Sequence, residues 1–182
     1  MTLYEKAKAY AIKCHTETNH LYDGLPYSFH LELVEKVAKK FIHLIRGSDR
    51  EIVYAACWCH DTIEDTRQTP NDVVKATNRA VALIVYAVTN EKGWTRGDRA
   101  NDKYYKGIRD TKYATFVKLC DRIANVLYSH SKMGDSTVSM FDKYKAENLH
   151  FVTELFDEKG TYQEMFDYLE EVLSERKLIE DI

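Results

Sequence analysis

The stretch CWCHDTIEDT (57–66) places four ionisable residues directly after a segment that is apolar enough for a protein core. The run EIVYAACW (51–58) is apolar and helix-forming, which predicts a buried helix. It is followed by the adjacent pair His60 and Asp61 and then, within four residues, by two more carboxylates. Such a helix end is either a solvated terminus or a set of ligands for something positive, and the rest of the chain bears on that choice.

The composition is that of an ordinary globular protein, with 182 residues, 45% of them apolar and 30% charged. This length predicts one domain over 1–182. The net charge of -3 gives no electrostatic reason to expect nucleic acid or an anionic membrane as a partner. No apolar segment approaches the roughly 20 residues that span a bilayer, and the N-terminus does not resemble a secretory signal. We therefore expect a cytoplasmic protein, whose oligomeric state the sequence leaves open.

Apolar residues recur with helical spacing along nearly the whole chain, and only two prolines and seven glycines interrupt them. This pattern predicts an all-α fold, with a break at NHLYDGLPY (19–27) and a loop at 91–98. The C-terminal helix should pack on the bundle. The expected helices are 3–17, 28–46, a third that Ser48 or Asp49 caps, 70–77 after Thr69 and Pro70, 79–90, 99–109, 112–132, 138–157 capped by Ser136 or Thr137, and 161–178. The cysteines in these helices are expected to be reduced core thiols: Cys14, Cys57, Cys59 and Cys120.

Three separated polar points lie at helix ends or on apolar helix faces. His30 begins one predicted helix, the pair His60-Asp61 closes another, and Asp121 lies inside the apolar segment VKLCDRIANV (117–126). A buried carboxylate requires a partner, because an unpaired charge in a core is costly. A surface ion pair of Asp121 with a neighbouring Lys or Arg remains the alternative. Taken together, two imidazoles and two carboxylates form a ligand set for one divalent ion such as Mn²⁺, Fe²⁺, Zn²⁺ or Co²⁺.

Two further carboxylates have a spacing that suits this predicted site. Glu64 follows His60 by four residues, and Asp65 follows Asp61 by four. On a continuing helix this spacing places each pair on one face, within reach of a metal-bound water. A metal lowers the pKa of such a water, and a nearby carboxylate can accept or relay its proton.

Four segments carry a resemblance to a known family: GLPYSFH (24–30), HDTIEDT (60–66), VALIVYAVTN (81–90) and VKLCDRIANV (117–126). Their H…HD…D pattern resembles the signature of the HD-domain metal-dependent phosphohydrolases. They are most similar to the hydrolase domain of the RelA/SpoT family, which includes small stand-alone hydrolases of the alarmone ppGpp. The similarity extends over roughly residues 4–150.

The resemblance implies an HD-type helical bundle around a single metal, which is manganese in the alarmone hydrolases, although Fe, Co and Zn suit the same ligands. It also assigns roles to individual side chains. These are the metal ligands His30, His60, Asp61 and Asp121, the acidic pair Glu64 and Asp65 that positions or activates the attacking water, and the substrate contacts Lys118, Asn125 and Tyr27. For Tyr27 a purely structural place in the core remains the alternative.

One stretch departs from the family pattern. Relatives that hydrolyse ppGpp usually carry a basic pair just before the GxPYxxH block, whereas this chain has NHLYD (19–23) there, without Arg or Lys. Either His20 or Tyr22 stacks on a base instead, or the stretch is a surface loop. Five cationic residues lie in or beside 91–109: Lys92, Arg96, Arg99, Lys103 and Lys106. They form either a solvated helix face or contacts to substrate phosphates.

The sequence therefore predicts a metal-dependent phosphohydrolase that acts on a small-molecule nucleotide, at a phosphoester or a pyrophosphate. The (p)ppGpp 3′-pyrophosphohydrolase reaction is the first candidate. The alternatives are an HD-type (deoxy)nucleotide phosphatase or triphosphohydrolase, and a non-catalytic nucleotide-binding regulatory module.

Overall fold

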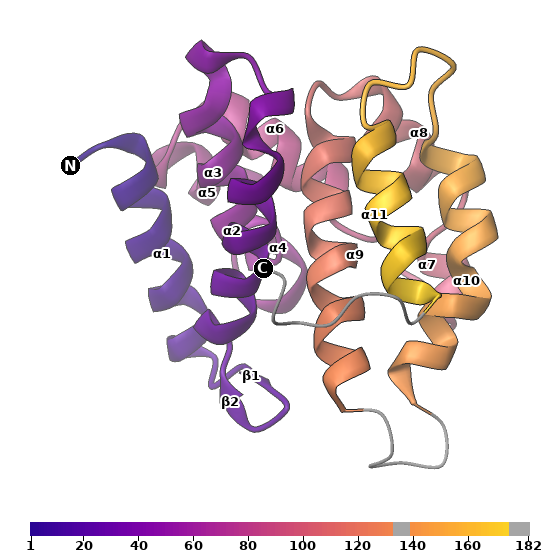
Figure 1. Ribbon diagram of the computed structural model, residues 1–182. Coiled ribbons are helices and arrows are strands. Elements are labelled where there is room, and N and C mark those ends of the chain that lie inside the picture. The colour runs from indigo at the N-terminus through magenta and orange to yellow at the C-terminus, as the bar shows by residue number, and fades with distance from the viewer. Residues whose placement is uncertain (133–138, 175–182) are drawn as a thin grey trace.

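The computed structural model describes residues 1–132 and 139–174 (Figure 1). Its helices in the N-terminal half are α1 (Leu3–Glu17), α2 (Ser28–Phe41), α3 (Arg50–Cys59), α4 (Thr62–Asp65), α5 (Pro70–Ala76) and α6 (Arg79–Val88). Those that follow are α7 (Arg96–Arg99), α8 (Asp102–Asp110), α9 (Ala114–Ser131), α10 (Met140–Leu155) and α11 (Gln163–Leu173). Two 3₁₀ turns, Ile42–Leu44 and Gly47–Asp49, join α2 to α3. The strands β1 (Leu21–Tyr22) and β2 (Leu25–Pro26) form the only sheet in these two ranges.

The all-α prediction is confirmed, and two helix starts follow from capping residues in the local sequence, of which Thr69 was expected and Thr2 was not. Thr2 and Glu5 form a capping box at the start of α1, and Thr69 and Asp72 form another at α5, where Pro70 occupies the first turn. Each box satisfies backbone N–H groups that a helix N-terminus otherwise leaves without a partner. Local sequence therefore fixes where these helices begin.

Other boundaries differ from the prediction. The helix expected over 28–46 ends at Phe41, and the segment expected as a loop over 91–98 contains most of α7, a single turn that a capping box at Thr95 starts. Asp49 precedes α3 but its side chain does not cap it; instead the carboxylate accepts hydrogen bonds from Lys112 Nζ and Tyr113 Oη. Here a tertiary contact replaces the local one.

Two predictions concern residues at the edges of the described ranges. Ser136 and Thr137 lie outside these ranges, and within them Ser139 caps α10. The structure follows α11 only to Leu173, so the last part of the helix predicted over 161–178 also lies outside.

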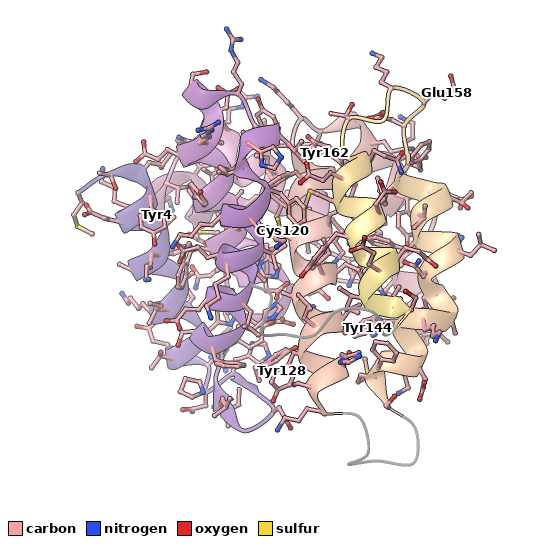
Figure 2. All side chains as sticks on the ribbon, viewed as in Figure 1. Tyr4, Cys120, Tyr128, Tyr144, Glu158 and Tyr162 are labelled. Atoms are coloured by element: carbon pink, nitrogen blue, oxygen red, sulfur yellow. The ribbon has the colours of Figure 1, made fainter. Side chains whose placement is uncertain are left out.

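Helix α9 occupies the middle of the molecule. It packs against α2 and α3 of the N-terminal half and against α10 and α11 on its other side (Figure 1). Cys120 of α9, which Figure 2 labels, is fully buried in this packing. Because α9 carries Asp121, this packing brings a carboxylate from late in the chain next to histidines from early in it. Helix α11 packs on α9 as predicted.

The break before α2 contains a β-hairpin that the prediction omitted. Leu21 pairs with Pro26 and Tyr22 with Leu25, so that Asp23 and Gly24 form the turn. Both turn residues have positive φ, 51° and 80°, as a two-residue type I′ turn requires. The hairpin holds Tyr22 over the first turn of α2, which carries His30.

All four cysteines are free and buried, which confirms the prediction of reduced core thiols. Throughout the described ranges, the helices are too short or too polar to cross a bilayer.

Candidate metal centre

The four predicted metal ligands come from three places in the fold that meet between α2, α3 and α9. His30 lies in the first turn of α2. His60 directly follows the last residue of α3, and Asp61 precedes the first residue of α4. Asp121 lies on the face of α9 that packs toward both helices. His30, His60 and Asp121 are buried.

Their ligand atoms converge. One such atom from each of His30, His60 and Asp121 lies within 4.8 Å of the others. Asp121 Oδ1 lies 3.3 Å from His30 Nε2 and 3.6 Å from His60 Nε2. Asp61 Oδ2 lies 2.8 Å from His60 Nε2 and 3.8 Å from His30 Nε2. The structure thus brings all four side chains into one cluster of two imidazoles and two carboxylates.

The hydrogen bonding of His60 suits a cation. Its Nδ1 lies 2.8 Å from the carbonyl oxygen of Cys57, so that Nδ1–H donates there and Nε2 keeps its lone pair. Among the described residues, the buried Nε2 has no hydrogen-bond partner with suitable geometry. A buried nitrogen with a free lone pair, facing two carboxylates, is a donor set that fits one divalent ion.

The electrostatics of the cluster are those of a cation site. Burial would raise the pKa of Asp121, but Lys118 and the two histidines hold it well below its usual range. Burial would lower the pKa of His60, but Asp61 and Asp121 raise it well above the usual range, so the lone pair of Nε2 binds a proton tightly unless a metal ion takes the place of that proton. Ionised carboxylates are therefore retained in the interior, where they favour a positive charge.

Asp121 is held by two neighbours on its own helix. Lys118 Nζ donates to Asp121 Oδ2 at 2.9 Å, and Asn125 Nδ2 donates to the carboxylate and, at 3.0 Å, to the Asp121 carbonyl oxygen. The alternative of a surface ion pair is therefore wrong: the pair with Lys118 exists but is largely removed from solvent, while Arg122 pairs with Glu147. Lys118 and Asn125 orient this carboxylate as well as facing the adjoining cavities.

The acidic pair lies on a separate short helix rather than on a continuation of α3. The expectation of a continuing helix is wrong, because the chain turns at His60-Asp61 between α3 and α4. The four-residue relation persists for the second pair, since the Asp65 N–H donates to the Asp61 carbonyl at 2.9 Å. Glu64 is held by Asn90, whose backbone N–H and Nδ2 donate to its two oxygens at 3.1 and 2.9 Å.

Asp65 has the electrostatics of a proton carrier. Partial burial of its carboxylate, followed by the charges of Asp61 and Glu64, raises the pKa of Asp65 to about 7, although much of the residue is exposed. A carboxyl group that titrates near neutral pH can both accept and donate a proton.

Tyr27 belongs both to the core and to this cluster. It is 8% exposed, and its Oη donates to Asp61 Oδ2 and lies 3.5 Å from Asp65 Oδ2. Two imidazoles stack on its ring, His15 at 4.3 Å and His20 at 4.0 Å between ring centroids. These two lie side by side, with their Nδ1 atoms 3.0 Å apart.

The stretch 19–23, which lacks the basic pair, thus packs its own rings against the residues of the site. The face of His20 packs on Tyr27, and Tyr22 stacks on His30 at 4.7 Å while its Oη donates to Asn125 Oδ1 at 2.9 Å. Neither ring lies in the free surface loop that was one alternative. Asn90 was missed as a site residue, although it closes the segment VALIVYAVTN. Tyr22 was expected only as a ring that stacks on a base or as part of a surface loop, although the Asp-Gly turn beside it signals the hairpin.

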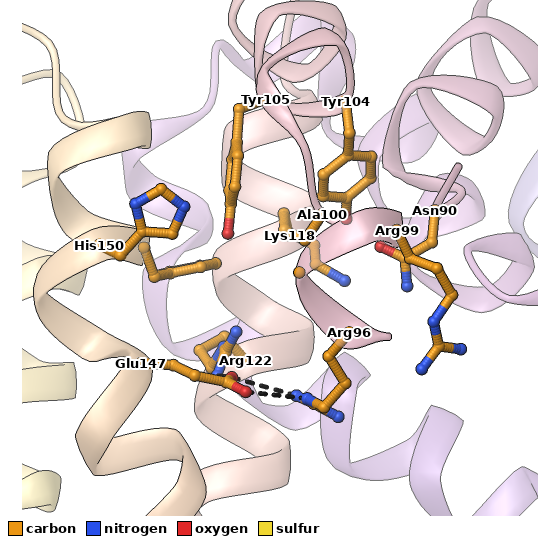
Figure 3. Close-up of a pocket in the computed structure, with 12 residues that line it drawn as sticks. Asn90, Arg96, Arg99, Ala100, Tyr104, Tyr105, Lys118, Arg122, Glu147 and His150 are labelled. Carbon is orange, nitrogen blue, oxygen red and sulfur yellow. Dashed lines mark hydrogen bonds and ion pairs between the residues drawn. The ribbon is translucent and has the colours of Figure 1, made fainter. Parts of the chain in front are cut away.

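Two cavities flank Asp121. One, of about 230 Å³, lies between α7, α8, α9 and α10 and includes Asn90 and Lys118 in its wall (Figure 3). The other, of about 680 Å³, includes Tyr22, Asn125, Tyr128 and Tyr144. The cluster therefore has a cavity on each side, one connected through Lys118 and one through Asn125.

Comparisons with known proteins agree with the resemblance. No protein-family model matches the chain. The chain is 31% identical over 104 residues to the guanosine-3′,5′-bis(diphosphate) 3′-pyrophosphohydrolase MESH1 of Danio rerio; the match covers 57% of this chain and 56% of that protein. The chain thus spans just over half the length of this curated relative.

The fold has a match over its whole length. A solved structure of a metazoan ortholog of SpoT that hydrolyses ppGpp superposes with a TM-score of 0.74 and 21% identity, covering 98% of each chain. The chain is thus similar in sequence to one ppGpp hydrolase and shares the fold of another. The expected all-α, HD-type fold is confirmed.

Proposed function

We propose that this chain is a metal-dependent phosphohydrolase that acts on a nucleotide, with the removal of the 3′-pyrophosphate of (p)ppGpp as its reaction. The observation that carries the proposal is the convergence of His30, His60 and Asp121 within 4.8 Å, with Asp61 beside them. Similarity to MESH1 and to the metazoan SpoT ortholog, both ppGpp hydrolases, supports the choice of substrate.

His30, His60, Asp61 and Asp121 would hold one divalent ion, for which we propose Mn²⁺. An ion in such a site supplies a Lewis acid for the phosphoryl oxygen and lowers the pKa of a bound water. The mixed N/O ligand set also accepts Fe²⁺, Co²⁺ and Zn²⁺.

The other side chains of the site have complementary tasks in this proposal. Asp65, with its pKa near 7, takes the proton of the attacking water and can return one to the leaving oxygen. Glu64, fixed by Asn90, orients that water. Tyr27 donates to Asp61 and so fixes the orientation of a ligand carboxylate. Lys118 and Asn125 face the adjoining cavities, where they can contact substrate phosphate and sugar.

The test is hydrolysis of a panel of ppGpp, pppGpp, GTP, dNTPs and nucleoside monophosphates, each with Mn²⁺ and then with EDTA. We expect release of pyrophosphate from ppGpp that EDTA abolishes. Turnover confined to another nucleotide would retain the chemistry but reject the alarmone as substrate. Absence of turnover on every nucleotide, with nucleotide binding intact, would reject the enzyme.

Two variants separate metal binding from catalysis. Asp121→Ala should lose both the bound metal, measured by elemental analysis, and the activity. Glu64→Ala should retain the metal and lose turnover, because Glu64 touches none of the ligand atoms in the cluster. A non-catalytic binding module predicts instead that Glu64→Ala changes nucleotide binding little.

A further inference from the structure

The cavity of about 230 Å³ between α7 and α10 has more positive than negative charge in its wall. Its wall contains one carboxylate, Glu147, and four cationic side chains: Arg96, Arg99, Lys118 and Arg122 (Figure 3). These come from three elements that are far apart in sequence, α7, α9 and α10. The fold therefore collects positive charge here although the protein as a whole carries a net charge of -3.

Two of these arginines are held in place by the single carboxylate. Glu147 accepts from Arg96 Nε at 2.8 Å and Arg96 Nη2 at 3.1 Å, and from Arg122 Nη1 at 3.1 Å. Both guanidinium groups also pack over the ring of Tyr144, at 5.7 and 4.8 Å from its centroid. One carboxylate neutralises only one of the two charges, and several N–H donors of both groups remain available.

Arg99 lacks even that compensation. Among the described residues, no carboxylate lies within ion-pair distance of its guanidinium, and its buried Nε has no hydrogen-bond partner. A buried cationic N–H without an acceptor is costly, so such groups are usually paired. Arg99 therefore brings an uncompensated cation to the wall of the cavity.

The cavity adjoins the candidate metal centre through two of its lining residues. Lys118 Nζ donates to Asp121 Oδ2 at 2.9 Å, and Asn90 holds both oxygens of Glu64. A group in the cavity would therefore lie beside the carboxylates that we propose for the metal and for the attacking water.

We propose that this cavity is a diphosphate subsite, in which Arg99, Arg122 and Lys118 bind the oxygens of two linked phosphate groups. Guanidinium groups match phosphate oxygens with paired hydrogen bonds. Glu147 leaves one of the charges of Arg96 and Arg122 uncompensated, and Arg99 adds a second, which suits a multiply charged anion. The proposal rests on the proposed function and deepens it: the diphosphate is either the pyrophosphate that leaves or the diphosphate that remains on the nucleoside.

Direct binding tests this proposal without catalysis. Metal-free protein in EDTA and low salt is titrated calorimetrically with inorganic pyrophosphate and, separately, with GDP. Arg99→Gln should weaken pyrophosphate binding roughly tenfold, because it removes a charge-assisted contact. Arg122→Lys, which keeps the charge but loses the planar fork, should weaken it several-fold. Lys103→Gln is the matched control, since Lys103 is exposed, lies outside the cavity and pairs with Glu91.

The pattern across the two ligands assigns the source of the diphosphate. If Arg99→Gln weakens pyrophosphate alone, the cavity receives the leaving group; if it weakens GDP as well, the cavity holds the diphosphate of the nucleotide. Absence of pyrophosphate binding to the wild-type protein, or binding that is equal in wild-type and Arg99→Gln, overturns the subsite.

Failure of the subsite and failure of the proposed function give different results. Binding that depends on Arg99 in a protein that hydrolyses no nucleotide would keep the subsite and reject the reaction. Hydrolysis of ppGpp together with binding that is independent of Arg99 would do the reverse. Circular dichroism on each variant verifies that the helical fold is retained.

Discussion

The two sides of Asp121 are built differently. Toward α7 and α8, Asn90 holds Glu64 and Lys118 holds Asp121. Asn90 and Lys118 also line a cavity, together with Arg99, whose Nε has no partner among the described residues. Toward the hairpin, aromatic rings stack on one another. Tyr22 stacks on His30, and the imidazoles of His15 and His20 stack on Tyr27. We call these the charged side and the aromatic side.

The difference indicates which side reacts and which side supports. On the charged side, the cationic Nε of Arg99 has no acceptor among the described residues, as expected where an anionic ligand completes the arrangement. The aromatic side also has a buried nitrogen without a partner, His15 Nε2, but burial lowers the pKa of that ring and keeps it neutral. On the aromatic side, Tyr27 and Tyr22 direct their hydroxyl groups to Asp61 and Asn125, so the rings hold site residues in place. Substitutions on the charged side should therefore affect turnover, and those on the aromatic side should affect metal affinity, substrate affinity or stability.

The largest effect is expected for Glu64→Gln on the charged side. The substitution keeps the shape of the side chain and one of its acceptor oxygens but removes the charge. We expect kcat to fall on the order of 1,000-fold with the metal content unchanged, as for the loss of a group that manages the attacking water. Wild-type turnover by the variant would show that the charged side does not perform the reaction.

The second prediction concerns stability and the aromatic side. Burial lowers the pKa of His15 from 6.5 to about 4, so the folded state binds fewer protons than the unfolded state between these two values. The contribution of His15 to the free energy of unfolding should therefore be most favourable above pH 6.5 and decrease by up to about 3 kcal/mol as the pH falls toward 4.

His15→Phe tests that origin, because it keeps a ring on Tyr27 and removes the titration. Denaturant unfolding at pH 8 and at pH 4.5 should show a smaller difference between the two pH values in the variant than in the wild type. Measurement at pH 8 is the internal control, because there His15 is neutral in both states. An identical pH dependence in both proteins would contradict the prediction.

Sequence predicted the parts of the site that depend on helix periodicity and on adjacent residues. The 3–17 helix agrees at both ends with α1, and the four ligands meet because His60-Asp61 ends one apolar helix while Asp121 lies on the apolar face of another. Burial of a carboxylate among apolar residues was the informative signal, since such a charge requires a partner.

The parts that sequence did not predict depend on contacts between distant elements. The cavity of the charged side forms where α7, α9 and α10 meet, and the pairing of Arg96 with Glu147 spans 51 residues. The interruption at His60-Asp61 was also hidden, because α3 and α4 both have helical spacing and only the turn between them separates the two. The hairpin, in contrast, has a local sequence signal that was overlooked. The dipeptide Asp23-Gly24 is typical of a two-residue turn, and both residues adopt the positive φ angles that such a turn needs.

A third prediction concerns the contact between the aromatic side and the metal ligands. Tyr27→Phe keeps the stacked ring but removes the hydroxyl that donates to Asp61. Loss of a partner that orients a ligand costs roughly 10-fold in metal affinity or activity. Titration with Mn²⁺, followed by activity, should show a tenfold higher metal requirement with nearly normal turnover at saturating metal. A loss of turnover that added metal does not restore would assign Tyr27 to the chemistry instead.

The smallest effect is expected at Tyr22, which lies at the outer edge of the aromatic side. Its hydroxyl donates to Asn125 Oδ1, and Asn125 in turn donates to Asp121. Tyr22→Phe keeps the ring over His30 and removes the donor to Asn125 Oδ1, which leaves the Asn125 amide held only through its Nδ2. This change should raise the KM for the nucleotide roughly fivefold, as the loss of one hydrogen bond predicts, with little change in kcat. Tyr128→Phe is the matched control, because Tyr128 lines the same cavity but bonds to the exposed Asp23. An equal change in both variants would mean that the cavity responds to any lost hydroxyl, whereas a decrease in kcat for Tyr22→Phe alone would extend the reacting part of the site to the aromatic side.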